Sequence, residues 1–130
     1  MKKEPIYPGK DTATGAYTPG IVVGETVYVS GQGPLDPATG KLIGTTIEEQ
    51  TRVTLENIKR ILTTAGCGMD DCVKLSAHLA NIDDFPRYNE VYRSFFTKPY
   101  PARTTVGSVL SRGMLVEIDA IAVRGSGKRE

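Results

Sequence analysis

Five short stretches of the chain show the composition and the alternation of apolar and polar residues that predict β-strands. They cover residues 21–23, 26–30, 72–80, 103–106 and 115–123. Gly24 and Glu25 separate the first two, and glycine at the first of two central positions favours a hairpin with a type II′ turn. In the third stretch, alternate apolar residues mark the side expected to face a core: Val73, Leu75, Ala77 and Leu79.

Two further stretches repeat apolar residues at helical spacing. The first begins with a capping box between Thr46 and Glu49, and it ends before Gly66, a residue suited to the position after a helix. Its inward face is expected to hold Ile47, Thr51, Leu55, Ile58, Ile61, Leu62 and Ala65. The second helix begins near Asp83, and it carries an aromatic stripe that we interpret as core: Phe85, Tyr88, Tyr92 and Phe95.

The order of these elements is strand, strand, helix, strand, helix, strand, strand. One mixed sheet with both helices on one face accommodates this order, which predicts a two-layer α/β domain. In the last strand, Glu117 and Asp119 share the outer face with apolar residues, and no helix is left to cover that face. Because an exposed apolar sheet face usually marks an interface, the pattern predicts a homo-oligomer.

Both ends of the chain lack such patterns. Residues 1–16 are polar and interrupted by proline and glycine, so we expect a loop or a loosely attached arm there. We therefore divide the chain into an N-terminal arm (1–14), a single domain (15–124) and a disordered tail (125–130).

Composition excludes several classes of function. A net charge of +1 over 130 residues gives no general attraction to nucleic acid or to anionic membranes. The chain has no apolar run of the roughly 18–20 residues that a membrane span needs, and its first residues do not resemble a signal peptide, so we expect a cytoplasmic protein. Cys67, Cys72 and the single histidine, His78, are too few and too poorly spaced for a zinc site. His78 falls on the polar side of its strand, where we expect a structural or solvent-facing role.

Arg103 lies where a rigid loop becomes a strand. Pro99 and Pro101 fix an extended approach, and the β-branched residues after Arg103 favour a strand. A planar guanidinium held in this way can bind a carboxylate through two parallel hydrogen bonds. Taken alone, the position of Arg103 is more typical of a surface ion pair or of a residue that caps a strand than of a ligand-binding site. A buried carboxylate needs a partner, and for Glu117 and Asp119 this arginine is one candidate.

Seven stretches of the chain together resemble the RidA/YjgF family of reactive-intermediate deaminases. The resemblance spans about residues 15–123. The matching stretches are YVSGQ (28–32), PLDPATG (34–40), EEQTR (48–52), LENIK (55–59), NEVY (89–92), PART (101–104) and VEIDAIA (116–122).

This resemblance implies a chorismate-mutase-like α/β fold and a homotrimer, in which three sheets form a central barrel and three clefts lie between subunits. It implies hydrolysis of 2-imino acids, such as 2-iminobutanoate and 2-iminopropanoate, or of their enamine tautomers, to 2-oxo acids and ammonia. The family's role is metabolite damage control, and it requires no cofactor and no metal.

The resemblance also assigns roles to individual residues. Arg103 matches the arginine that binds the substrate carboxylate, and Glu117 matches the glutamate near the attacking water. Thr105 stands where the family presents a backbone carbonyl to that water. The remaining matches line or close the pocket: Tyr17, Ser30, Gly31 and Asn89.

Three single positions and the stretch VGS (106–108) depart from the commonest family pattern. Thr105 often has a cysteine counterpart, which matters little for a backbone role. Gly33 stands where isoleucine is usual, and Ala16 stands where proline is usual before Tyr17. The last two changes bear on the shape of the pocket.

Two other functions remain compatible with the same residues. One is a non-catalytic trimer that binds small carboxylic acids or acts as a chaperone, with Arg103 as an anchor only. The other is a ribonuclease or translation inhibitor, which the near-zero net charge and the lack of a basic stripe disfavour. The preferred imino acid depends on pocket width, which the sequence does not give.

Overall fold

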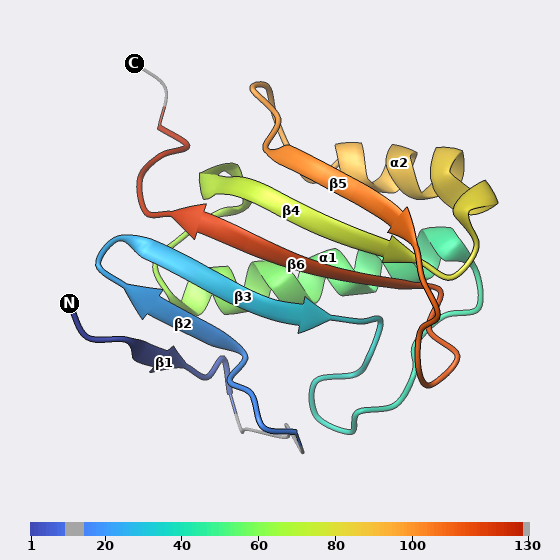
Figure 1. The fold of residues 1–130 in the computed structure, drawn as a ribbon, viewed down its shortest axis with the longest axis horizontal. Coiled ribbons are helices and arrows are strands. Elements are labelled where there is room, and N and C mark those ends of the chain that lie inside the picture. Colours follow the sequence, from blue (N-terminus) through green and yellow to red (C-terminus); the bar gives the residue numbers. More distant parts are fainter. Residues whose placement is uncertain (10–14, 129–130) are drawn as a thin grey trace.

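The computed structural model describes residues 1–9 and 15–128, and in them a six-stranded sheet packs against two α-helices (Figure 1). The strands are β1 (Glu4–Ile6), β2 (Gly20–Val23), β3 (Thr26–Gln32), β4 (Cys72–Leu79), β5 (Ala102–Gly107) and β6 (Val116–Val123). The α-helices are α1 (Ile47–Thr64) and α2 (Phe85–Arg93), and two short 3₁₀ helices are η1 (Met69–Asp71) and η2 (Ile82–Asp84).

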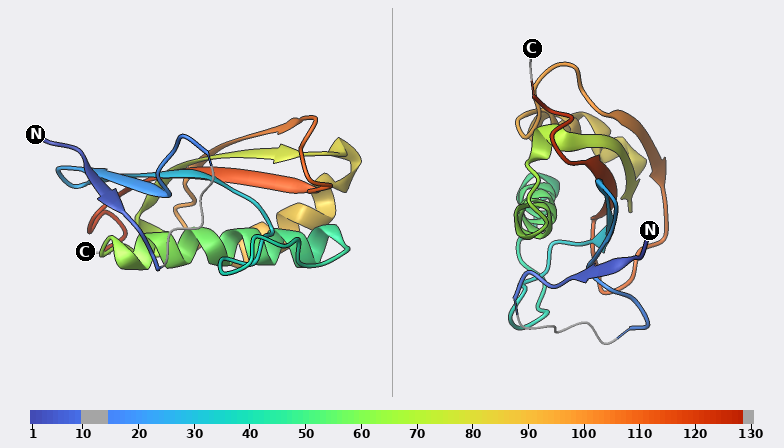
Figure 2. Two further views of the ribbon diagram at one scale, coloured as in Figure 1. Left: turned by 90° about the horizontal axis from the view of Figure 1, so that it is seen from below. Right: turned by 90° about the vertical axis from the view of Figure 1, so that its left-hand side faces the viewer.

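The strand order is β1-β2-β3-β6-β4-β5, so β5 is an edge strand. Neighbouring strands are antiparallel, except that β4 and β5 run parallel. Both helices lie on one face of the sheet (Figure 2). The predicted two-layer α/β architecture with a mixed sheet is therefore confirmed.

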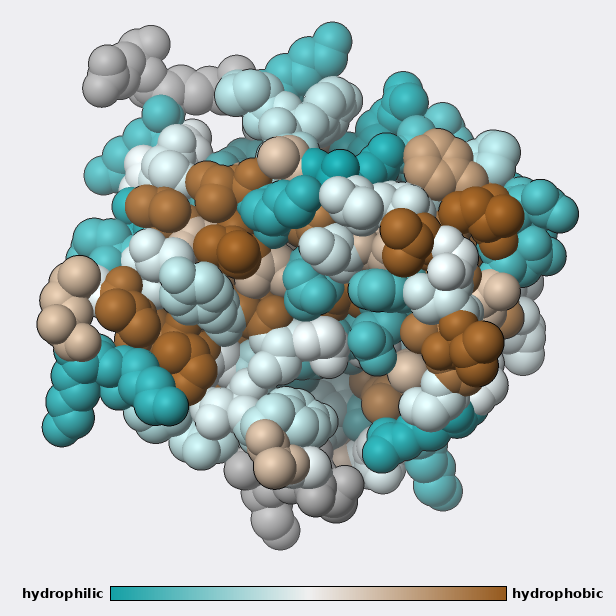
Figure 3. Space-filling view, in the orientation of Figure 1, coloured by the Kyte–Doolittle hydropathy of each residue, from teal (hydrophilic) through white to brown (hydrophobic). Residues whose placement is uncertain are grey.

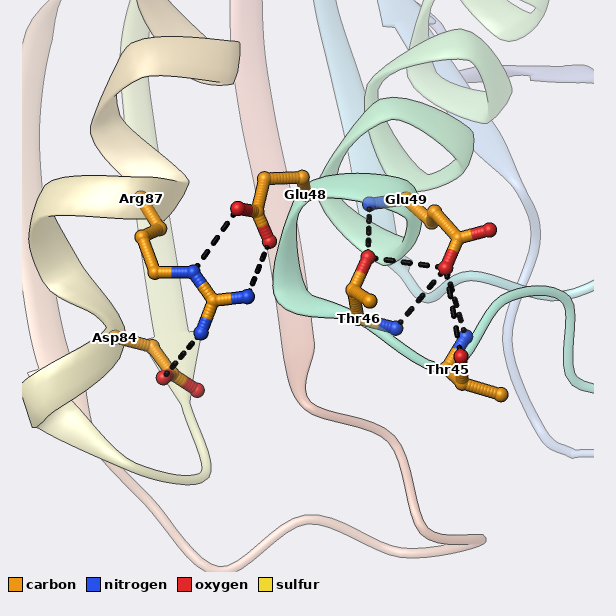
Figure 4. A network of polar contacts seen from close by, with 6 residues as sticks. All are labelled: Thr45, Thr46, Glu48, Glu49, Asp84 and Arg87. Carbon is orange, nitrogen blue, oxygen red and sulfur yellow. Dashed lines mark hydrogen bonds and ion pairs between the residues drawn. The ribbon is translucent and has the colours of Figure 1, made fainter.

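Helix α1 begins at the predicted capping box. The backbone N–H of Glu49 donates to Thr46 Oγ1 at 3.2 Å, and the backbone N–H of Thr46 donates to Glu49 Oε1 at 3.2 Å (Figure 4). The predicted inward face is buried against the sheet, and Leu55, Ile58 and Leu62 are fully enclosed. The helix is followed by Gly66 at a φ of +79°, a conformation that glycine adopts without strain.

Strand β4 differs from the sequence prediction at its start. Val73 was expected to face the core, but it is 41% exposed, and Cys72 is buried instead. The pairing of β4 with β6 shifts register between Cys72 and Lys74. Such a bulge adds one residue to a strand and reverses the faces on either side of it, which the regular alternation cannot reveal.

The expected N-terminal loop is wrong for residues 4–6. They form β1 at the edge of the sheet, where Pro5 pairs with Ile21 and Ile6 packs against the core. An edge strand tolerates a proline because one of its sides makes no ladder hydrogen bonds. The rest of the proposed arm includes residues 10–14, which lie outside the described residues.

The expected disorder of the C-terminal tail is wrong for residues 125–128. They form turns that are attached to η1, because Ser126 Oγ donates to the carbonyl of Asp71 at 3.0 Å and the N–H of Gly127 donates to Asp71 Oδ1 at 2.8 Å. The other tail residues, 129–130, lie outside the described residues.

The second face of the sheet has no helix over it. Figure 3, which looks onto this face, shows apolar patches separated by polar side chains. Tyr28 of β3 is 47% exposed and Val106 of β5 is 41% exposed. Strand β6, which carries the carboxylates of Glu117 and Asp119, lies between β3 and β5 in the sheet. The uncovered face agrees with the sequence pattern. The homo-oligomer inferred from that pattern and the homotrimer implied by the family resemblance both stay predictions.

Candidate active site

Arg103 lies on the helix side of β5 and is held by α2. Its Nη1 donates a hydrogen bond of 2.7 Å to Asn89 Oδ1. Its guanidinium carbon lies over three aromatic rings of α2, at 4.6 Å from the centroid of Tyr92, 5.3 Å from Phe85 and 5.8 Å from Tyr88. These cation–π contacts and the hydrogen bond fix the orientation of the planar group.

The aromatic side chains of α2 therefore have two structural roles. Tyr88 and Tyr92 are buried in the core, as predicted, and their rings also form the wall on which Arg103 rests. The sequence predicted only the packing of these rings in the core. The helical spacing of the aromatic residues was visible in the sequence, but their contact with an arginine of a later strand was not.

Part of the Arg103 guanidinium remains free to bind a ligand. Among the described residues, Asn89 accepts a hydrogen bond from it, the hydroxyl of Tyr88 is a second polar contact, and no carboxylate lies within ion-pair distance. A guanidinium has five N–H donors, so donors remain for a bidentate contact with a carboxylate. The suggestion that Arg103 partners Glu117 or Asp119 is wrong within one chain, because both carboxylates lie on the other face of the sheet.

Thr105 lies on the same side of β5 as Arg103 and ties the strand to α2. Its Oγ1 is 3.1 Å from the hydroxyl of Tyr88. Burial raises the pKa of the Tyr88 phenol, so this hydroxyl is neutral and can donate or accept. The side chain of Thr105 thus has a structural contact, and the role predicted for its backbone carbonyl stays a prediction.

Glu117 lies on the open face, in β6, and borders Gly31 of β3. A Cβ atom at Gly31 would be 3.0 Å from Glu117 Oε2, so a side chain there would crowd the carboxylate. The pairing of β3 with β6 is irregular between Val29 and Gln32, which places Ser30 and Gly31 in a bulge. Ser30 Oγ donates to the carbonyl of Thr18 and holds the segment that follows Tyr17.

Tyr17 and Gly31 line a cavity of about 380 Å³ next to this bulge. Gly33 also lines it, and a Cβ atom there would be 2.2 Å from Met114 Sδ, so Met114 fills the space of a side chain at position 33. Asn57 Nδ2 donates to the carbonyls of Gly33 and Leu35 at 3.0 and 2.9 Å. These two contacts hold the loop, and sequence reasoning found neither because they join distant segments.

The predicted site residues thus form two groups on opposite faces of the sheet. The first group, on the helix side at the β5 edge, consists of Arg103, Asn89 and Thr105. The second group lies on the open face around the β3 bulge and consists of Glu117, Gly31 and Ser30. Tyr17 belongs to neither group, because the cavity that it lines is bordered by Asn57, Arg60 and Ile61 of α1. Strand β4 separates β5 from β6, so one chain assembles each group but does not bring the two together.

A family model described as Endoribonuclease L-PSP matches residues 9–124. The chain belongs to this family, also called RidA/YjgF. The resemblance stated from the sequence motifs is therefore confirmed over nearly the whole chain.

Individual members of the RidA/YjgF family are close to this chain. A RutC family protein of Saccharolobus solfataricus is 49% identical over 109 residues, which are 83% of this chain and 86% of that protein. A 2-iminobutanoate/2-iminopropanoate deaminase of Bos taurus is 41% identical over 114 residues, 87% of this chain and 83% of that protein. The crystal structure of E. coli TdcF with bound serine matches with a TM-score of 0.85 at 35% identity, and it covers 94% of this chain and 99% of that one.

Among residues 1–9 and 15–128, no group of three or more His, Cys, Asp or Glu side chains could hold a metal ion, and no helix is long and apolar enough to cross a membrane. Cys67 and Cys72 are buried free thiols. Burial raises the pKa of Cys72 to about 12, which keeps it protonated and unreactive at neutral pH.

Proposed function

We propose that this protein is a hydrolytic deaminase that converts reactive 2-imino acids, such as 2-iminobutanoate and 2-iminopropanoate, to 2-oxo acids and ammonia. The observation that carries the proposal is the fixed Arg103 guanidinium, which keeps free donors at the edge of the sheet. The deaminase relatives at about 40% identity give independent support. We expect the protein to act in the cytoplasm.

The chemistry requires two groups. Arg103 binds the substrate carboxylate through two parallel hydrogen bonds, which places C2 of the imine at a fixed distance from the protein. Glu117 takes a proton from a water molecule as the water oxygen bonds to C2 and the C=N π electrons move to nitrogen, and Glu117 returns that proton to the nitrogen. The C–N bond then breaks with its electron pair on nitrogen, the new hydroxyl at C2 gives up its proton to the departing ammonia, and C2 becomes a carbonyl. The reaction consumes one water and needs no oxidant or group acceptor.

Positioning supplies most of the rate in this scheme. A protonated imine is already a good electrophile, so the protein has to hold water and C2 together rather than activate a poor leaving group. Such positioning is worth at most about 7–11 kcal/mol. Asn89 and the rings of Phe85 and Tyr92 would contribute by preventing the guanidinium from rotating.

We further propose that a complete site forms between two copies of the chain in a homotrimer. Arg103 lies on an edge strand, where a second molecule can approach, whereas Glu117 lies on the open face beside Gly31. Packing the open face of one copy against the β5 edge of the next would join the two groups. Tyr17 would then close the cleft, with Ser30 and Gly31 lining it.

The proposal is tested by competition for a short-lived imine. A threonine dehydratase generates 2-iminobutanoate, semicarbazide traps it, and the protein competes with the trap. We expect the wild type to suppress trapping, Arg103→Ala to fail, and Arg87→Ala, which removes an exposed arginine paired with Glu48, to behave as wild type. If the wild type is folded and assembled but does not suppress trapping, the deaminase proposal fails for this substrate.

A non-catalytic carboxylate binder is the second candidate. It is favoured by the TdcF structure, which holds serine, an amino acid with a free carboxylate. A protein that binds a 2-oxo acid through Arg103 but leaves semicarbazide trapping unchanged would establish this alternative.

A further inference from the structure

The single histidine of the chain lies directly beside Glu117. His78 of β4 pairs with Glu117 of β6 in the antiparallel ladder, and both residues are half-buried on the open face. Residues paired in this way have Cβ atoms about 4.5–5.5 Å apart. An imidazole that gains a proton there would place a positive charge next to the carboxylate.

Ser108 fixes the orientation of this imidazole. His78 Nδ1 is 2.7 Å from Ser108 Oγ, which is the one hydrogen bond of the ring among the described residues. The backbone N–H of Ser108 donates to the carbonyl of Leu79 at 2.9 Å, so the serine is itself held in place. The ring nitrogen Nε2 is left to interact with water or with another group on the open face.

The other groups facing His78 can be named from the strand pairing. On β6 they are Glu117 and, one pair along, Asp119 opposite Ser76. On β5 the neighbour is the apolar Val106, and Lys74 lies farther along β4, where its Nζ donates to Thr104 Oγ1 at 3.1 Å. Burial raises the pKa of the Asp119 carboxyl, and the nearby side chains of His78 and Lys74 act in the opposite direction. His78 is therefore electrostatically coupled to Asp119 on this face, and it is the cross-strand neighbour of Glu117.

We propose that His78 is a positioning residue for the deaminase reaction, and that the neutral imidazole is the form that supports hydrolysis. A protonated His78 would oppose proton uptake by Glu117 and would repel a cationic imine. Because imidazoles titrate between about pH 5 and 8, hydrolysis should fall as the pH is lowered through that range. This inference rests on the proposed function.

The coupling can be measured without any activity assay. Since His78 is the only histidine, its ring resonances in an NMR spectrum need no assignment. We expect Glu117→Gln to shift the ring resonances of His78 at a fixed pH, because the two side chains are cross-strand neighbours. Glu56→Gln, which removes an exposed carboxylate on α1, should leave these resonances in place. Unchanged ring resonances in Glu117→Gln would overturn the coupling.

The role in the reaction is tested by the pH dependence of kcat. We expect the wild type to lose about tenfold in kcat between pH 8 and pH 5.5, and His78→Gln to lose less than about twofold. Ser108→Ala should lower kcat at pH 8 but keep the decline toward acid pH, because the ring loses its fixed partner and is still present. An active wild type whose pH profile is unchanged in His78→Gln would overturn this inference alone. An inactive wild type would overturn the proposed function and with it the catalytic role of His78.

Discussion

Replacing Arg103 by lysine keeps the positive charge at the β5 edge but removes the planar fork. In the structure, Nη1 donates to Asn89 Oδ1 at 2.7 Å while the plane of the group rests over the ring of Tyr92. An ammonium group is a point charge on a flexible stem, and it cannot bond to Asn89 and present two parallel N–H groups to a carboxylate. We therefore expect Arg103→Lys to bind substrate through one hydrogen bond in place of two.

The size of the loss follows from that geometry. A hydrogen bond between charged groups contributes about 1.5–3 kcal/mol, so losing one of the pair should weaken binding of the carboxylate about 10- to 150-fold. A further loss of about 0.5–1 kcal/mol is expected if the ammonium leaves the aromatic wall. Since both effects act on carboxylate binding, KM should rise more than kcat falls.

The assay compares kcat and KM for imine hydrolysis and the Kd of a 2-oxo acid in three proteins. These are the wild type, Arg103→Lys and Arg87→Lys. Arg87 is a matched control, because its Nε and Nη2 donate to the two carboxylate oxygens of Glu48 at 2.9 and 2.7 Å on the surface (Figure 4). Exposed ion pairs contribute little, so this control should bind as wild type. An Arg103→Lys protein with wild-type Kd and KM would refute the bidentate model.

Three further predictions concern the scaffold of the site. Asn57→Ala removes the donors to the carbonyls of Gly33 and Leu35 and should lower the free energy of unfolding by about 2–4 kcal/mol in urea titrations; a loss below about 0.5 kcal/mol would contradict it. Gly33→Ala places a Cβ against Met114 Sδ and should cost about 1–3 kcal/mol, and the double variant with Met114→Ala should cost less than the sum of the two single changes. Because burial raises the pKa of Cys72 to about 12, this thiol should react with a disulfide reagent at pH 8 only after urea unfolds the chain, and rapid reaction of the native protein would show that it is accessible.

Local signals explain why much of the fold was predictable. The capping box at Thr46 and the periodicity of α1 depend on residues within a few positions of one another, and the structure confirms both. The exceptions are features set by distant partners. One exception is β1, in which Ile6 pairs with a strand that begins 14 residues later, at Gly20. The other is the register shift between Cys72 and Lys74, which turns the side chain of Val73 toward solvent.

The site was predictable only in part for the same reason. A rigid approach followed by a strand predicted that Arg103 is held by the backbone, and its fixed orientation agrees with that, whereas its role in a site came from the family resemblance. The rings that support it lie on another element, and the space beside Gly33 is filled by Met114, so no local pattern contains these contacts. The alternation within β5 and β6 did not show that Arg103 and Glu117 face opposite sides, because the two strands are joined only through β4.

The central claim is that Arg103 of one copy works with Glu117 of another. It is tested by unfolding Arg103→Ala and Glu117→Ala together in urea, refolding the mixture, and measuring imine hydrolysis. Each variant alone should be inactive. In randomly mixed trimers, about one site in four would pair an intact Arg103 with an intact Glu117 from a neighbour, so about a quarter of the wild-type activity should return. No recovery in trimers shown by mass spectrometry to contain both variants would contradict the claim.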